Sequence, residues 1–111
     1  MIQPGQYDIT VQRRGDFDIS FQLKDSDGIA VDLNGSTVEA QIWSTHRRAK
    51  LVDFTVAMID EGIGKFAIKL TEAQTINLPD TCYYDVRVTD SLGNSYYWIR
   101  GTVTAETGYT E

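Results

Sequence analysis

The chain has 111 residues, enough for one domain, and its 41% hydrophobic and 23% charged content excludes a wholly disordered protein. Ten basic against sixteen acidic residues leave a net charge of −6, the wrong sign for binding a phosphate backbone, so we expect no nucleic-acid partner. The first residues resemble no secretion signal, and no apolar run approaches the roughly 20 residues that span a bilayer. These features predict a soluble domain, made in a cytoplasm and with no membrane partner.

Apolar and polar residues alternate along most of the chain. Because successive side chains of a strand point to opposite faces, this period of two predicts strands with one buried face and one wet face. A wet face is typical of antiparallel sheets that are covered on one side only. The alternating runs occupy, in chain order, residues 7–11, 17–23, 38–42, 52–58, 66–70, 84–88 and 97–103.

Turn sequences separate these runs at the spacing of a β-sandwich: "RRGD", "DSDG", "LNGS", "DEGIG" and "DSLGN". Gly and Asx residues tolerate the positive φ angles of tight turns. One segment, "LTEAQTINLPD" (70–80), breaks the alternation. It predicts a single helical turn with Thr71 as its N-cap and Pro79 closing it, which crosses from one sheet to the other.

Seven or eight short strands with one crossover favour an all-β fold, an immunoglobulin-like antiparallel β-sandwich. A small β-barrel is the alternative, because alternation alone does not reveal closure of a sheet. We expect a single domain over residues 1–111, with residues 1–6 and 106–111 as flexible arms.

An acidic stretch, "LKDSDGIAVDLNG" (23–35), raises the question of a metal site. Asp25 and Asp27 have the spacing of the first two ligands of a helix-loop-helix calcium loop. The later positions, which need a ligand, a glycine and a glutamate, hold Ile29, Ala30 and Ser36. We therefore predict a hairpin turn without a metal, and Asp25, Asp27 and Asp32 remain only weak candidates for a cation site.

Catalytic chemistry has little support in the sequence. His46 and Cys82 are each unique and could in principle form a nucleophile pair. His46 lies in the polar "STHRRAK", however, and Cys82 opens a strand, where a small apolar role is expected. No nucleophile elbow or phosphate-binding glycine loop is present. We expect no enzyme, no catalytic residue and no cofactor.

Aromatic residues gather in "YYDV" (83–86) and "SYYWIRG" (95–101), which should form adjacent antiparallel strands. Strict alternation assigns Tyr84, Tyr97 and Ile99 to the core. The opposite face then carries Tyr83, Arg87, Tyr96, Trp98 and Arg100. Exposed Tyr, Trp and Arg are enriched at protein interfaces, although cross-strand aromatic pairs also stabilise sheets by themselves. We predict that these five residues form a protein interface.

The order of these features is familiar along residues 7–105. "LKDSDG" and "VDLNG" are followed by "LTEAQTINLP", then by "YYDVRVTD" and a final strand with Arg100, Gly101 and Val103. This order resembles a group of small virion proteins of tailed bacteriophages. It is also similar to the N-terminal domains of some phage upper-baseplate proteins.

The resemblance implies a non-enzymatic structural component of a virion, present as a homo-oligomer or in many copies and bound to other virion proteins. It carries over no catalytic residue. An assembly or adaptor role in the tail, baseplate or fibre attachment is the first expectation. A capsid decoration or head–tail accessory protein is the alternative, and a carbohydrate- or receptor-binding module is a second one.

Overall fold

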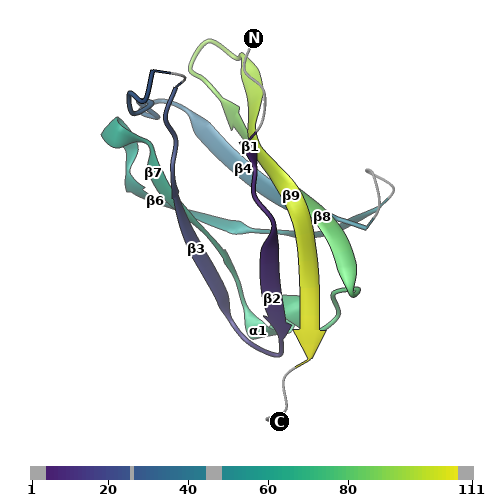
Figure 1. Ribbon diagram of the computed structural model, residues 1–111. Coiled ribbons are helices and arrows are strands. Elements are labelled where there is room, and N and C mark those ends of the chain that lie inside the picture. Colours follow the sequence, from purple (N-terminus) through teal and green to yellow (C-terminus); the bar gives the residue numbers. More distant parts are fainter. Residues whose placement is uncertain (1–4, 26, 45–48, 108–111) are drawn as a thin grey trace.

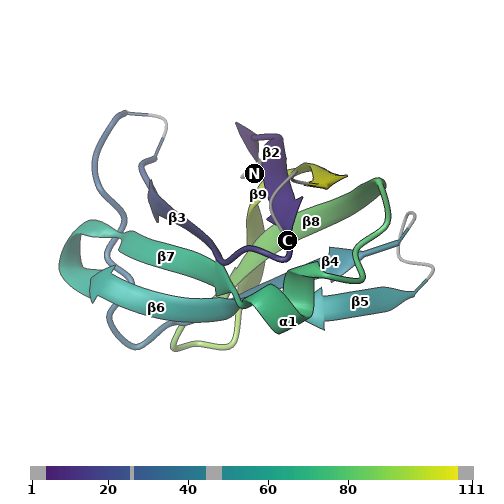
Figure 2. The same ribbon diagram turned by 90° about the horizontal axis from the view of Figure 1, so that it is seen from below.

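Two β-sheets packed face to face form the fold of the computed structural model, which describes residues 5–25, 27–44 and 49–107 (Figures 1 and 2). The larger sheet, sheet A, has the strand order β1-β9-β8-β4-β5, and β2 also pairs with β9. The smaller sheet, sheet B, has the order β3-β7-β6. The predicted all-β sandwich is confirmed, and the barrel alternative is wrong because the two sheets remain separate.

The described residues form nine strands, more than the seven or eight that we predicted, because the run at 52–58 is divided into two strands and a further short strand precedes the run at 7–11. The strands are β1 (Gly5–Gln6), β2 (Ile9–Arg13), β3 (Phe17–Gln22), β4 (Thr37–Trp43), β5 (Lys50–Asp53), β6 (Thr55–Asp60), β7 (Lys65–Leu70), β8 (Thr81–Thr89) and β9 (Ser95–Thr107). A 3₁₀ turn, Glu61–Ile63, joins β6 to β7, and a short helix, α1 (Glu72–Thr75), joins β7 to β8.

The chain is kinked between β1 and β2, at Tyr7 and Asp8. Both strands run parallel to β9, and Asp8 Oδ1 accepts a hydrogen bond from the N–H of Thr102 at 2.9 Å. The buried Tyr84 hydroxyl donates to the Tyr7 carbonyl at 2.5 Å. A β-carbon at Gly101 would clash with that same carbonyl, so only glycine allows the two backbones to approach this closely.

The divided run at 52–58 changes sheets at Phe54. This buried residue donates its N–H to the Ala40 carbonyl at 2.9 Å and separates β5 in sheet A from β6 in sheet B. A single stretch of chain therefore bends around one side of the sandwich. The strand orders β5-β4-β8-β9 and β3-β7-β6 correspond to the C′-C-F-G and B-E-D sheets of a variable-type immunoglobulin domain.

The core fills the space between the sheets and contains the inward positions of each alternating run. Its largest fully buried side chains are Phe66, Leu33, Ile42, Ile68, Val11, Val86, Val103, Thr75 and Cys82. Aromatic rings cross the core as well: Phe54 contacts Tyr84 edge-on, with ring centroids 6.1 Å apart.

The predicted helical crossover is confirmed as α1. Thr71 is its N-cap and forms a capping box with Gln74, whose Oε1 accepts from the Thr71 N–H at 2.8 Å. The buried Thr75 hydroxyl donates to the Gly15 carbonyl at 2.8 Å, and Asp16 Oδ1 accepts from the Glu72 N–H at the same distance. The crossover is thus fastened to the turn between β2 and β3.

Strands extend into both of the segments that we expected to be flexible arms. Residues 5–6 form β1 on the edge of β9, and residues 106–107 continue β9 beside β2, because backbone pairing orders both ends. Residues 1–4 and 108–111 lie outside the described residues. No helix in the described part of the chain is long and apolar enough to cross a membrane.

Candidate interaction face

The solvent side of sheet A forms a flat surface built from β4, β8 and β9, which we call the outer face. Its side chains lie in rows of cross-strand partners. The rows are Glu39–Arg87–Tyr97, Gln41–Asp85–Arg100 and Trp43–Tyr83–Thr102. Every one of these side chains is half-buried or exposed.

A β-bulge decides which aromatic residues reach the outer face. Val86 lies opposite Ile99 but Arg87 lies opposite Tyr97, so Trp98 is the extra residue between two pairs. Tyr97 therefore stands on the outer face beside Arg87. The prediction that Tyr97 belongs to the core is wrong.

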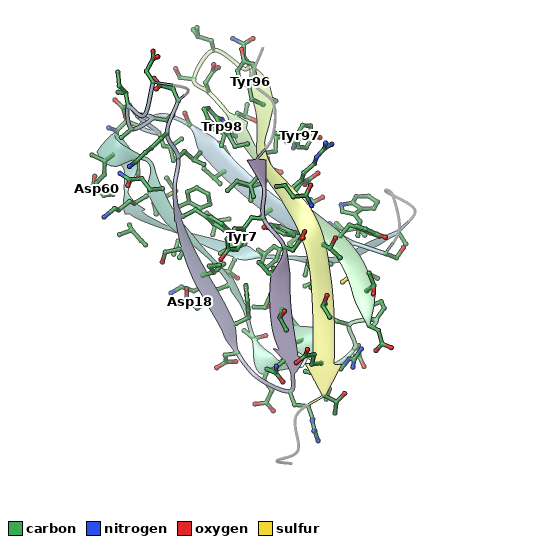
Figure 3. The ribbon with its side chains drawn as sticks, viewed as in Figure 1. Tyr7, Asp18, Asp60, Tyr96, Tyr97 and Trp98 are labelled. Carbon is green, nitrogen blue, oxygen red and sulfur yellow. The ribbon has the colours of Figure 1, made fainter. Side chains whose placement is uncertain are left out.

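The same bulge reverses the assignment of Trp98 and Tyr96. Trp98 packs against the core, and Tyr96 lies opposite the buried Val88, on the core side of the strand (Figure 3). The prediction that these two residues lie on the outer face is wrong. It assumed strict alternation along the whole strand, but the bulge adds one residue at Trp98 and reverses the alternation there. Trp98→Ala therefore tests packing of the fold and not contact with a partner.

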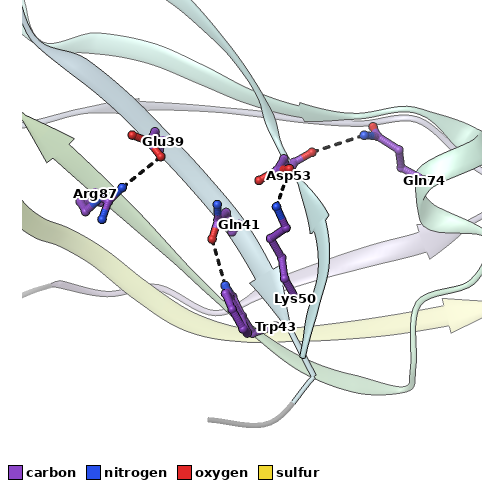
Figure 4. A network of polar contacts seen from close by, with 7 residues as sticks. All are labelled: Glu39, Gln41, Trp43, Lys50, Asp53, Gln74 and Arg87. Atoms are coloured by element: carbon purple, nitrogen blue, oxygen red, sulfur yellow. Dashed lines mark hydrogen bonds and ion pairs between the residues drawn. The ribbon is translucent and has the colours of Figure 1, made fainter. Parts of the chain in front are cut away.

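The other three predicted residues, Tyr83, Arg87 and Arg100, do lie on the outer face. Arg87 forms an ion pair with Glu39 at 3.1 Å (Figure 4), and the Glu39 carboxylate raises the pKa of Arg87 above its ordinary value. Sequence reasoning missed Trp43. Its position after the buried Ile42 already indicated an outward side chain, but only the pairing of β4 with β8 places it beside Tyr83.

Polar contacts hold this region in place. Trp43 donates its indole N–H to Gln41 Oε1 at 3.1 Å (Figure 4). Beyond β4, Lys50 and Asp53 of β5 form an ion pair at 3.1 Å, and Gln74 of the crossover donates to the Asp53 carbonyl at 3.3 Å. The contacts of Lys50, Asp53 and Gln74 are exposed and of low individual strength, so they orient side chains more than they stabilise the fold.

Two hollows lie on the outer face, and Trp43 borders both. The larger has a volume of about 390 Å³, and its lining includes Gln6, Trp43, Tyr83, Asp85, Arg100 and Thr102. The smaller, of about 50 Å³, is lined by Glu39, Gln41, Trp43, Asp85, Arg87 and Tyr97. Rigid aromatic rings around shallow hollows can receive a protruding side chain or a small ring from a partner.

The charged side chains in these rows of the outer face sum to zero, although the whole chain has a net charge of −6. Arg87 and Arg100 offset Glu39 and Asp85 within two adjoining rows. A balanced surface with three aromatic rings and two arginines has the composition of a protein–protein contact.

The acidic stretch forms turns, as predicted. Asp25 Oδ1 accepts from the N–H groups of Asp27 and Ile29 at 2.9 and 3.0 Å, and Asp32 Oδ1 accepts from the Asn34 N–H at 2.9 Å. Gly28 takes the positive φ, 79°. No group of three possible metal-ligating side chains occurs within the described residues.

The "DSLGN" turn repeats this solution in the second hairpin. Asp90 Oδ1 accepts from the N–H groups of Leu92 and Asn94, both at 2.9 Å, and Gly93 has a φ of 87°. The aspartate fixes the turn in each case by bonding the backbone two and four residues further along.

Of the two candidate nucleophile residues, only Cys82 belongs to the described part of the chain. Cys82 is fully buried, and burial raises the pKa of its thiol to about 11, so the thiolate is scarce at neutral pH. His46 lies outside the described residues.

Comparisons with known proteins agree with the fold. The sequence model of one family, described as an LtfC-like β-sandwich domain, matches residues 3–106. No curated protein sequence matches the chain significantly. Among solved structures, a mutant of the SrpA adhesin from Streptococcus sanguinis is similar, with a TM-score of 0.54 and 14% sequence identity. The match covers 89% of this chain and 54% of the adhesin chain, so this chain spans about half the length of that neighbour. At this identity the likeness concerns the fold alone.

Proposed function

This chain belongs to the family of LtfC-like β-sandwich domains, and from that premise we propose that it is a non-catalytic assembly module that works through protein–protein contact. We propose further that its setting is the particle of a tailed bacteriophage, in the tail, baseplate or fibre attachment, where it occurs in several copies. A capsid decoration or head–tail accessory position is the alternative within the same setting.

The outer face of sheet A is the observation that carries the contact function. Trp43, Tyr83 and Tyr97 present three rigid rings on three neighbouring strands, with Arg87 and Arg100 between them. Residues of these types dominate the binding energy of protein interfaces because they combine large apolar area with a polar group. Partner contacts at such a face require no reactive group.

The order of motifs along residues 7–105 supports the phage setting. The aspartate turns, the capped crossover and the last strand follow each other as in small virion proteins of tailed phages. That support comes from sequence resemblance and is separate from the support for the contact face.

Two substitutions on the outer face test the contact function. Trp43→Ala combined with Arg100→Ala should prevent incorporation of the chain into its assembly, while the thermal midpoint of the isolated domain changes little. Leu92→Ala combined with Thr55→Ala, at exposed positions of the β8–β9 turn and of β6, away from the outer face, is the matched control. Normal incorporation of the double outer-face variant would contradict the proposal.

The setting is tested separately, by mass spectrometry of purified phage particles produced from the genome that encodes the chain. The proposal requires the chain in those particles at several copies. Its absence would overturn the phage setting and leave the contact face to a different kind of partner.

A carbohydrate- or receptor-binding module is the second candidate, favoured by the larger hollow. Trp43 and Tyr83 offer ring faces beside the planar polar groups of Asp85, Arg100 and Gln6. The SrpA neighbour is an adhesin, which is consistent with this candidate but rests on fold likeness alone. A glycan array tests this candidate. Glycan binding that is lost in Trp43→Ala would support a sugar site at the larger hollow, and no binding to any glycan would contradict it.

A further inference from the structure

Strand β3 is an open edge of sheet B. It pairs with β7 over six consecutive residue pairs, from Phe17–Leu70 to Gln22–Lys65, with no shift of register, and no other strand of the described chain pairs with it. The other edges are irregular. The β6 pairing shifts after Met58, the β5 pairing shifts at Trp43, and β2 adjoins the kink at Tyr7. Straight, regular edges of this kind accept an added strand most readily.

The polar backbone groups on that edge follow from the register. The Leu23 N–H donates to the Gly64 carbonyl at 3.0 Å, on the β7 side. Because hydrogen-bonded and non-bonded pairs alternate in an antiparallel ladder, Phe17, Ile19 and Phe21 also bond towards β7. The N–H and C=O groups of Asp18, Ser20 and Gln22 therefore point to the open edge (Figure 3 labels Asp18).

We propose that this edge pairs with β3 of a second copy of the chain, antiparallel and with Ser20 opposite Ser20, so that the two B sheets become one continuous six-stranded sheet. The inference needs only the fold, and it does not depend on the phage setting or on the outer face. A twofold axis through the Ser20 pair makes the contact closed and symmetric, the commonest arrangement of protein dimers.

The register is complementary in charge. Asp18 lies opposite Gln22 of the second copy; one N–H of the Gln22 amide donates to the Ile63 carbonyl of its own chain at 3.1 Å, and the second N–H is the donor for the carboxylate. One step beyond the strand in the same register, Asp16 lies opposite Lys24. Both contacts occur twice by symmetry, and like charges never lie directly opposite each other. Two chains of net charge −6 repel at most approaches, so a register free of opposed acidic groups is favoured.

Apolar side chains are complementary as well. Ile19 lies opposite Phe21 of the second copy on the core side of the sheet, and Phe17 lies opposite Leu23. Phe17, Ile19 and Phe21 are only half-buried in the single chain, although they pack against its core. Phe21 also contacts Tyr7 edge-on, with ring centroids 5.5 Å apart, and Tyr7 is 48% exposed. An added strand removes part of this surface from water.

A contact of one strand with one strand buries less surface than a standard interface, so we expect a weak, concentration-dependent dimer. Sedimentation velocity of the full chain over a wide concentration range measures it. A strictly monomeric chain at the highest soluble concentration overturns the proposal.

Charge variants at Gln22 test the register. Gln22→Lys places a cation opposite Asp18 of the second copy and should tighten the dimer about fivefold, whereas Gln22→Glu should weaken it about fivefold. Within one chain the order is reversed. Both variants lose the amide bond from Gln22 to the Ile63 carbonyl, but position 22 lies opposite Lys65, so Lys should give the lower thermal midpoint of the two. If the dimer affinity of the two variants changes in the same order as their thermal midpoints, the proposed register is wrong.

Ser20→Pro tests the edge itself. Its missing N–H faces the open side, so the ladder with β7 loses no hydrogen bond, while the dimer loses one donor from each copy. We expect the dimer to weaken about tenfold or more. Ser20→Lys, which opposes two cations at the axis, is the second variant, and Thr104→Lys on β9 is its charge-matched control. If the dimer persists in both Ser20 variants but is lost in the double variant Trp43→Ala with Arg100→Ala, the two copies meet through the outer face. That result would overturn the proposed pairing of β3 edges.

Discussion

The β3–β7 ladder and the β8–β9 ladder differ in regularity, although both come from alternating sequences. The first keeps its register over six pairs, whereas the second gains a residue at Trp98. The regular ladder therefore presents every side chain where the period of two predicts it. The bulged ladder exchanges Tyr97 with Trp98 and so decides which aromatic rings lie on the outer face.

The two sheets consequently offer different kinds of contact. Sheet A presents a face, with Trp43, Tyr83, Tyr97 and two arginines. The outward side of sheet B contains a row of small residues, Ser20, Ala67 and Ala57, and its available feature is the β3 edge. A face selects partners through side chains, whereas an edge binds through the backbone.

Gly101→Val should have the largest effect, because it disturbs the close contact between β9 and the kink at Tyr7 in sheet A. A β-branched side chain cannot fit against the Tyr7 carbonyl, so β1 and β2 must move away from β9. We expect a loss of roughly 3 kcal/mol or more in the free energy of unfolding, measured in urea. Thr104→Val, at an exposed position of the same strand, should stay within about 0.5 kcal/mol. Equal losses of stability in Gly101→Val and Thr104→Val would contradict a close backbone contact between Gly101 and Tyr7.

The two tryptophans give the most direct test of the bulge. Trp98→Ala should cost about 2 kcal/mol of stability, because it leaves a gap at the core. Trp43→Ala should cost no more than about 1 kcal/mol, because its ring lies on the outer face. Thermal or urea unfolding of both variants measures this order. The reverse order would place Trp98 on the outer face, as strict alternation predicted.

Tyr84→Phe removes the hydroxyl that bonds the Tyr7 carbonyl at 2.5 Å. The carbonyl loses a donor in a partly buried place, so we expect a loss of about 1 to 2 kcal/mol. The same substitution leaves β3 and β7 untouched, and amide hydrogen exchange should therefore rise in β1 and β2 but not in sheet B. An equal rise of amide exchange in both sheets would contradict a local role of the Tyr84 hydroxyl.

Asp8 should give the smallest effect, and one that depends on pH. The hydrogen bond from the Thr102 N–H, with a second from Gln6, lowers the pKa of Asp8 below its ordinary value. A lowered pKa in the folded state stabilises the fold above the unfolded pKa, and this contribution disappears as the pH falls through the folded pKa.

The stability difference between the parent chain and Asp8→Asn should therefore be constant at neutral pH and shrink below about pH 4. Urea unfolding at a series of pH values measures it. Asp18→Asn on sheet B, whose contact with Lys69 is exposed at 3.8 Å, is the comparison. A difference that grows on acidification would contradict the assigned hydrogen bond.

Local sequence determined much of this protein. Alternation predicted the strands and their inward residues, such as Phe66 and Ile68, because a strand with one wet face must alternate. The Asp-x-x-Gly turns and the Thr71 cap were predictable because their bonds join residues only a few positions apart. Tyr83, Arg87 and Arg100 were predictable as surface residues for the same local reason.

Only the tertiary structure decided the remainder. The bulge at Trp98, the change of sheet at Phe54 and the kink at Tyr7 depend on partners far along the chain, which no local pattern encodes. Trp43 joined the outer face only through its pairing with Tyr83. The period of two fixes the side of each residue relative to its neighbours, but the pairing of distant strands determines which side faces the solvent and which edge stays open.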